Sequence, residues 1–179
     1  MDETHFLQLL EDIKDRLYNY ARKMLYSAAD ADDVFSDAVL SMWEQRANFT
    51  LGTNFKAWAF KVLLNKIYNC NRKANLARGY VQANAPSDED EYAQPDSRQA
   101  EDILRDPSTW MEFCHDDVKR AFDLLNPSEK ETLLLQVVGD LSYAEIAATT
   151  GAPEPTVMTR LARAKKKMRL ALSNHIKTS

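Results

Sequence analysis

The C-terminal part of the chain carries the side chains whose types and spacing point most clearly to a chemistry. Residues 154–179 include seven lysines and arginines and one acidic residue. Apolar residues recur at steps of three and four, which predicts an amphipathic helix from about Pro155 to Asn174. Its inward face would comprise Val157, Leu161, Ala164, Met168 and Leu172. The other faces mix hydroxyl, arginine and lysine side chains, which suits contact with the base edges and phosphates of DNA.

The segment before this helix has the pattern of a helix-turn-helix. Ser142 and Glu145 have capping-box spacing, in which each side chain bonds the backbone N–H of the other residue, and they open a short helix through Ala148. Gly151 is expected to end that helix, because glycine readily adopts the left-handed conformation common there. This order of elements favours a DNA-binding unit over residues 142–168. The alternative is a solvated basic helix that only packs on its neighbours.

A second basic segment lies in the N-terminal half. Residues 55–79 hold six lysines and arginines and no acidic residue, whereas residues 80–117 hold eleven acidic residues against two basic ones. The net charge of −4 hides this sorting. Two separate basic segments indicate two contacts with a polyanion, and chance clustering on solvated faces is the alternative.

Helical periodicity runs through the whole chain, and only four glycines and six prolines serve as turn formers. We therefore predict an all-α fold rather than a β-sandwich. In the N-terminal half we predict helices at 4–26, from an Asp30 N-cap to about Trp43, and at 55–73, with a loop at 48–54. The third helix carries Tyr68 among its hydrophobic residues, and the core would include Trp43 and Trp58.

The C-terminal half predicts four helices, at about 118–125, 127–138, 142–148 and 155–174. Asn126 is the expected N-cap of the second of these, with Pro127 at its first helical position. Its inward side chains would be Leu133, Leu134 and Val137, and Gly139-Asp140 would end it. Composition thus separates two small helical domains, residues 1–78 and 113–179, joined by an acidic, flexible linker at 79–112.

No residue pattern points to catalysis, a metal or a membrane. The three histidines are isolated, and no paired carboxylates, nucleophile motif or phosphate-binding loop is present. Cys70 and Cys114 lie in no metal-binding spacing and are interpreted as reduced thiols. The polar N-terminus is unlike a secretion signal, and the apolar runs are far shorter than a bilayer requires. We expect a cytoplasmic protein without enzymatic activity, metal or cofactor.

Two stretches together resemble the extracytoplasmic-function (ECF) class of bacterial sigma factors, which belongs to the sigma-70 family. Asp30–Trp43, followed by Gly52–Trp58 and Asn65, is similar to region 2 of that family. Leu125–Ala164, which contains the Ser142–Ala147 helix start, is similar to region 4. The resemblance covers about residues 5–78 and 113–172, and the two regions occur in the family's order.

For the first domain, the resemblance implies contacts with bacterial core RNA polymerase and with the −10 promoter element. The β′ clamp helices of the polymerase would bind the second helix, through Asp33, Asp37 and Leu40. The loop after that helix would receive a base flipped out of the duplex, which requires a pocket of polar and aromatic groups. The implied −10 residues are Phe49, Thr53, Asn54, Lys56, Lys61, Asn65 and Asn69.

For the second domain, the resemblance implies reading of the −35 element, and a contact with the polymerase β flap. Thr159 and Arg163 would contact base edges, and Lys166 and Lys167 the DNA backbone. Thr156, Met158 and Arg160 would lie beside them. An anti-sigma factor is a further implied partner, and membrane insertion is not implied. The acidic linker would thread through the polymerase and mimic RNA there, or be only a solvated tether.

Two other functions compete with a promoter-specificity subunit. A sigma-mimicking interaction protein would bind a regulator but not DNA, which the basic last helix argues against. A stand-alone helix-turn-helix regulator would bind operators without polymerase, and would have no need of the region 2-like half.

Overall fold

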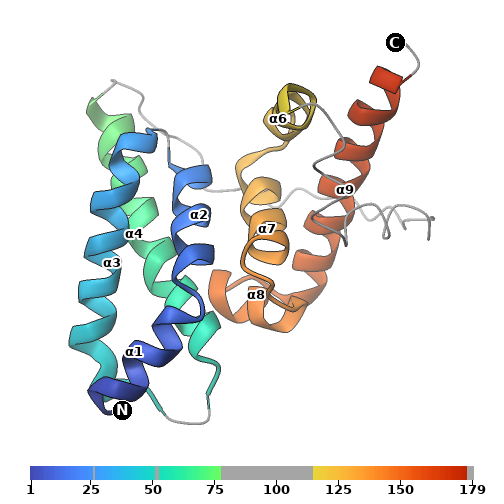
Figure 1. Ribbon diagram of the computed structural model, residues 1–179. Coiled ribbons are helices and arrows are strands. Elements are labelled where there is room, and N and C mark those ends of the chain that lie inside the picture. Colours follow the sequence, from blue (N-terminus) through green and yellow to red (C-terminus); the bar gives the residue numbers. More distant parts are fainter. Residues whose placement is uncertain (26, 51–52, 78–114, 177–179) are drawn as a thin grey trace. The chain divides into compact units, whose positions relative to one another are not determined.

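A computed structural model describes residues 1–25, 27–50, 53–77 and 115–176, and this part of the chain is helical with no strand (Figure 1). The helices group into two compact units, one built from α1 to α4 and one from α6, α7, most of α8 and α9. An all-α fold is therefore confirmed. The predicted linker at 79–112 lies outside the described residues, as does Cys114.

The first unit contains α1 (Glu3–Glu11), α2 (Lys14–Met24), α3 (Ala31–Gln45) and α4 (Phe55–Ala77). Short 3₁₀ turns at Ala28–Asp30 and Arg46–Asn48 flank α3. In the second unit, α6 (His115–Asp123), α7 (Pro127–Val137), α8 (Tyr143–Thr150) and α9 (Glu154–Ile176) follow one another. The close packing of α3 on α4, and of α6 and α7 on α9, builds one core in each unit.

The single helix predicted at 4–26 is wrong, because the chain bends between α1 and α2. Ile13 leaves the helical conformation, with φ −122° and ψ −6°, and its N–H donates to the Leu10 carbonyl three residues back. No proline or glycine marks the bend. Ile13 is buried together with Phe6 and Leu17 on either side of it, so tertiary packing, rather than a local breaker, accounts for the change of direction.

Aromatic rings fill much of the core of the first unit. Phe6 meets Trp43 and Phe55 edge to face, with ring centroids 5.5 and 5.8 Å apart. Phe49 and Trp58 continue this cluster, with centroids 5.2 Å apart. Both tryptophans that were predicted to lie in the core contribute rings to the cluster, although each stays partly exposed.

Asp30 stands at the predicted N-cap of α3 but does not cap the helix with its side chain. Its backbone is already helical, with φ −78° and ψ −8°, because the preceding 3₁₀ turn ends there. The Asp30 carboxylate instead accepts a hydrogen bond from the Cys70 thiol, with Sγ 3.9 Å from Oδ2. Burial and the nearby Asp30 charge raise the pKa of the Cys70 thiol, because both disfavour the thiolate.

The second unit has the predicted buried stripe along α9. Val157, Ala164 and Met168 have no exposed surface, Leu161 is 1% exposed and Leu172 9%. In α7, Leu133 and Leu134 are buried as predicted, whereas Val137 is only half-buried. The Ser142–Glu145 capping box is also confirmed, since each backbone N–H donates to the side chain of the other residue.

The turn between α8 and α9 depends on Gly151, whose φ is +75°. A Cβ at this position would meet no atom within 4 Å, so only the backbone conformation disfavours other residues. We expect Gly151→Ala to lower the free energy of unfolding of the protein by about 1 kcal/mol. Thermal unfolding would show this as a fall in Tm of about 4–8 °C. Gly151→Asn is the matched control, because asparagine tolerates the left-handed region better; an equal loss from both variants would contradict the explanation.

Candidate nucleic-acid and protein interfaces

The outward side of α9 presents polar side chains opposite its buried stripe. Thr159, Arg163 and Lys166 recur at steps of four and three, which places them on one face, with Lys166 exposed and the other two half-exposed. Thr159 Oγ1 donates to the Pro155 carbonyl at 3.0 Å, so its oxygen can still accept a hydrogen bond from outside. The remaining predicted DNA contacts near the start of α9 are exposed or half-exposed: Thr156, Met158 and Arg160.

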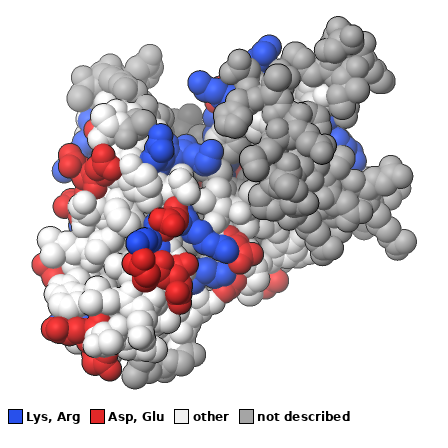
Figure 2. All heavy atoms as spheres, in the orientation of Figure 1, with Lys and Arg blue, Asp and Glu red and all other residues white. Residues whose placement is uncertain are grey.

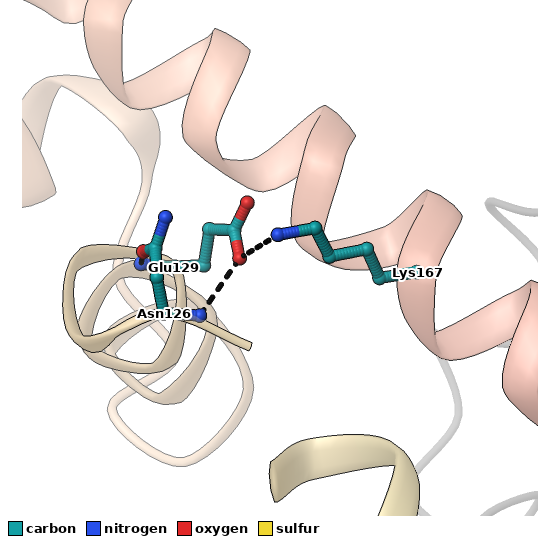
Figure 3. A network of polar contacts seen from close by, with 3 residues as sticks. All are labelled: Asn126, Glu129 and Lys167. Carbon is teal, nitrogen blue, oxygen red and sulfur yellow. Dashed lines mark hydrogen bonds and ion pairs between the residues drawn. The ribbon is translucent and has the colours of Figure 1, made fainter. Parts of the chain in front are cut away.

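Lys167 of α9 contacts a residue at the start of α7 (Figure 3). Its Nζ lies 2.8 Å from Oε2 of Glu129, a residue at the start of α7 whose side chain is 3% exposed. The same carboxylate oxygen accepts the Asn126 backbone N–H at 2.9 Å, and Asn126 Oδ1 accepts the Glu129 N–H at 2.8 Å. The Asn126 N-cap and Pro127 at the first helical position were predicted, but this capping box and the ion pair were not.

A stripe of exposed side chains runs along α4 without any acidic residue. Lys61, Asn65, Asn69 and Arg72 are spaced by four, four and three residues and are all exposed. Arg72 Nη2 lies 3.5 Å from Asn69 Oδ1. Lys56 is half-buried at the start of the helix. Three of the four −10 residues predicted on α4 thus share an exposed face that offers hydrogen-bond donors and positive charge.

Tyr68 also lies on this exposed stripe, although it was not among the predicted −10 residues. It is 46% exposed, and stands three residues after Asn65 and four before Arg72. The spacing from Asn65 and Arg72 is the sequence signal that places Tyr68 on the same face of the helix. An exposed aromatic ring among amides and cations is a group on which an unpaired base can stack.

The residues of the predicted base-flipping loop take structural roles. Phe49 is 7% exposed and packs edge to face on Phe55 with centroids 5.5 Å apart, so its ring is not presented for stacking. Asn54 Oδ1 accepts the Ala57 N–H at 3.0 Å and thereby caps α4. Thr53 is exposed, and its hydroxyl donates to the Thr50 carbonyl at 2.7 Å. Residues 51–52 lie outside the described part.

Acidic side chains and one leucine form an exposed face on α3. Asp33, Asp37 and Leu40 recur at steps of four and three, and Leu40 is 55% exposed. Within the described ranges neither of these two carboxylates forms an ion pair or a hydrogen bond. Their neighbour Asp32 differs, because it accepts the Tyr18 hydroxyl at 2.7 Å, a bond that raises the pKa of Tyr18 and ties α2 to α3.

On part of the face drawn in Figure 2, acidic and basic side chains lie side by side. Among the described residues, no group of three or more histidine, cysteine or acidic side chains is placed to hold a metal ion. None of the described helices combines the length and apolar character needed to cross a bilayer.

Two family descriptions match this chain, "Sigma-70 region 2" over residues 9–79 and "Sigma-70, region 4" over residues 115–168. A relative named ECF RNA polymerase sigma factor SigE, from Mycolicibacterium smegmatis, is 27% identical over 169 residues, which are 94% of this chain and 62% of that protein. RNA polymerase sigma factor SigV of Bacillus subtilis is also 27% identical, over 92% of this chain and 89% of its own. The chain therefore spans less than two thirds of the first of these relatives.

Two solved structures share the fold. The sigma factor RpoE, crystallised with the anti-sigma factor NepR from Bartonella quintana, matches with a TM-score of 0.71 and 24% identity over 94% of this chain and 97% of that one. CnrH, in complex with the cytosolic domain of CnrY, matches with a TM-score of 0.64 and 21% identity over 97% and 90%. Because region 2 is followed by region 4 and relatives over nearly the full chain include ECF sigma factors, the chain belongs to the ECF class of the sigma-70 family.

Proposed function

We propose that the protein is a promoter-specificity subunit that binds bacterial core RNA polymerase and directs transcription initiation at promoters with −10 and −35 elements. Residues 1–78 form the polymerase-binding and −10 domain, 79–112 the linker, and 113–179 the −35 domain. The observation that carries the proposal is the face of α9. Its buried stripe leaves Thr159, Arg163 and Lys166 outward, at the position of a recognition helix after a capped helix and a glycine turn.

The −35 element is read by α9 in this proposal. The Arg163 guanidinium can donate two parallel hydrogen bonds to a guanine edge, and Thr159 offers a hydroxyl beside it. Met158, which is 51% exposed, can make an apolar contact with the methyl group of a thymine. Lys166 supports these base contacts by holding a phosphate.

The −10 element is opened and held by α4. The exposed Asn65 and Asn69 amides can hydrogen-bond to the edges of unpaired bases, and Lys61 and Arg72 can neutralise phosphates. Tyr68 adds a ring on which a base can stack. This stripe supports single-strand binding better than the predicted Phe49 does, because the Phe49 ring is buried. Thr53, exposed before α4, and Asn54 remain at the edge of the site.

Core polymerase binds the face of Asp33, Asp37 and Leu40 on α3. Two exposed carboxylates beside an exposed leucine suit a partner surface with basic side chains around an apolar contact. One structural neighbour, the sigma factor RpoE, is in complex with the anti-sigma factor NepR, and another, CnrH, is in complex with the cytosolic domain of CnrY. We infer that an anti-sigma factor holds this protein as well.

Run-off transcription on genomic DNA of the source organism tests the proposal. Purified protein is added to bacterial core polymerase, and the RNA 5′ ends are sequenced. We expect new start sites that share two upstream motifs. Core binding without start sites, or tight operator binding without core, would contradict the proposal; the latter would favour a stand-alone regulator.

A single substitution assigns the upstream motif to α9. We expect Arg163→Ala to reduce initiation about tenfold or more at promoters with a guanine in the −35 motif, since one bidentate arginine–guanine contact is worth about 1–3 kcal/mol. Promoters without that guanine should be affected less. Leu170→Ala, an exposed position further along α9, is the control. Equal losses at all promoters would show that Arg163 does not read sequence.

A further inference from the structure

Lys167 is held at a fixed point of the second unit, unlike the lysine beside it. Its ammonium group lies 2.8 Å from the buried Glu129 carboxylate, although 44% of the Lys167 side chain is exposed (Figure 3). The two residues are 38 positions apart in the sequence, so the contact joins α9 to the start of α7. Lys166 is exposed, and within the described part of the chain it forms no ion pair.

The Glu129 carboxylate is itself immobilised. It belongs to a capping box in which Oε2 accepts the Asn126 backbone N–H, while the Glu129 N–H donates to Asn126 Oδ1. The capping box therefore holds the Glu129 carboxylate at the start of α7, and the ion pair links α9 to that point. Lys167 directly precedes Met168 of the buried stripe, whereas Thr159, Arg163 and Lys166 lie on the opposite face.

A DNA phosphate would have to compete with this carboxylate for the lysine. Glu129 is 2% exposed as a residue, and removing the cation from a buried carboxylate is unfavourable, because its charge would be left uncompensated in a medium of low dielectric. Lys166 can neutralise a phosphate without the free-energy cost of breaking an ion pair with a buried carboxylate. The two adjacent lysines therefore have different roles.

We propose that Lys167 is a positioning residue, which orients the recognition helix α9 through Glu129, and that it does not neutralise a DNA phosphate. This replaces the backbone contact predicted from the lysine run. The inference rests on the proposed function, because it assumes that α9 reads DNA. Its consequence is that Lys167 governs how well base contacts fit, whereas Lys166 governs how strongly any sequence is bound.

The salt dependence of DNA binding separates these roles. The full chain is used to enrich a duplex from a random-sequence pool, and binding to that duplex and to a scrambled duplex is measured over a range of KCl concentrations. We expect Lys166→Met to weaken binding to both duplexes. It should also make the slope of log binding constant against log salt concentration shallower by about 0.9, the change for one lost phosphate contact. Lys167→Met should leave the slope unchanged but lower the preference for the enriched duplex about tenfold, the scale of one lost base contact.

Glu129→Gln supplies the matched test from the other side of the ion pair. Glutamine still accepts the Asn126 N–H and keeps the capping box, but it has no charge for Lys167. We expect it to lower the preference about as much as Lys167→Met does, and adding Lys167→Met to it should cause little further loss. Lys167→Arg, which keeps the cation, should retain most of the preference.

Two results would overturn the role of Lys167. One is a reduction of the salt-dependence slope in Lys167→Met that equals the reduction in Lys166→Met. The other is an unchanged preference in the folded variant, with only its Tm lowered, since a merely structural ion pair would give that outcome. If circular dichroism shows that Lys167→Met does not fold, the salt slope and the duplex preference of Glu129→Gln and Lys167→Arg test the role of Lys167 instead. Failure to enrich any duplex would instead overturn DNA reading by α9, and this proposal with it.

Discussion

Phe60→Ala is expected to remove most of the stability of the first unit. Phe60 and Tyr20 have no exposed surface, and their rings meet edge to face with centroids 5.4 Å apart, joining α4 to α2. Truncating a buried phenylalanine costs about 3–5 kcal/mol, because apolar burial is lost and a cavity remains. Whole domains are stable by about 5–15 kcal/mol, and small ones lie at the lower end of that range.

Denaturant unfolding followed by tryptophan fluorescence measures this effect, since Trp43 and Trp58 report on the first unit. Tyr68→Ala is the matched control, because it also truncates an aromatic residue of α4 but one that is 46% exposed. We expect the control to cost about 1 kcal/mol or less. Similar losses from both variants would mean that the Tyr20–Phe60 contact is not the centre of this core. Such a result would also contradict the proposal that Phe60 serves stability whereas Tyr68 serves DNA binding.

Features that depend on neighbours in the sequence were the ones the sequence predicted well. The α9 stripe at steps of three and four is buried, and the Ser142–Glu145 capping box is formed, because both follow from local helical geometry. The helix start at Asn126-Pro127 was also predicted. In each case the signal and its structural partner lie within a few residues of one another.

Features that depend on distant contacts were missed. The bend at Ile13 has no local breaker, and it follows from burying Phe6 and Leu17 in one core. The ion pair between Lys167 and Glu129 joins residues that are 38 positions apart. A run of three lysines gives no sign that one of them pairs with a buried carboxylate. Asp30 has a capping residue's identity, but the 3₁₀ turn before it and the Cys70 thiol redirect its side chain. Phe49 likewise has the aromatic ring that the prediction required, but this ring is buried in the core of the first unit.

Reversing the charges of Asp33 and Asp37 together is expected to abolish productive binding to core polymerase. Both carboxylates are exposed on α3, about one helical turn apart, and Leu40, which is 55% exposed, lies about one turn beyond Asp37. If this face meets basic side chains, Asp33→Lys with Asp37→Lys places like charges against each other across the interface, at a cost of several kcal/mol. We expect the affinity for core polymerase to fall about 100-fold or more, which corresponds to about 2.7 kcal/mol.

The stability cost of this double variant should be small, because neither side chain is buried and only the favourable position of Asp33 in the first turn of α3 is lost, about 0.3–1 kcal/mol. Fluorescence anisotropy of the labelled protein with purified core polymerase measures the affinity. Asp12→Lys with Asp15→Lys is the matched control, because it makes the same change in net charge at exposed positions around the start of α2. Equal losses from both pairs would attribute binding to net charge, and no loss from the α3 pair would move the polymerase contact to another face. A loss confined to the α3 pair, with unchanged binding of the enriched duplex, would separate polymerase docking on the first unit from DNA reading by the second.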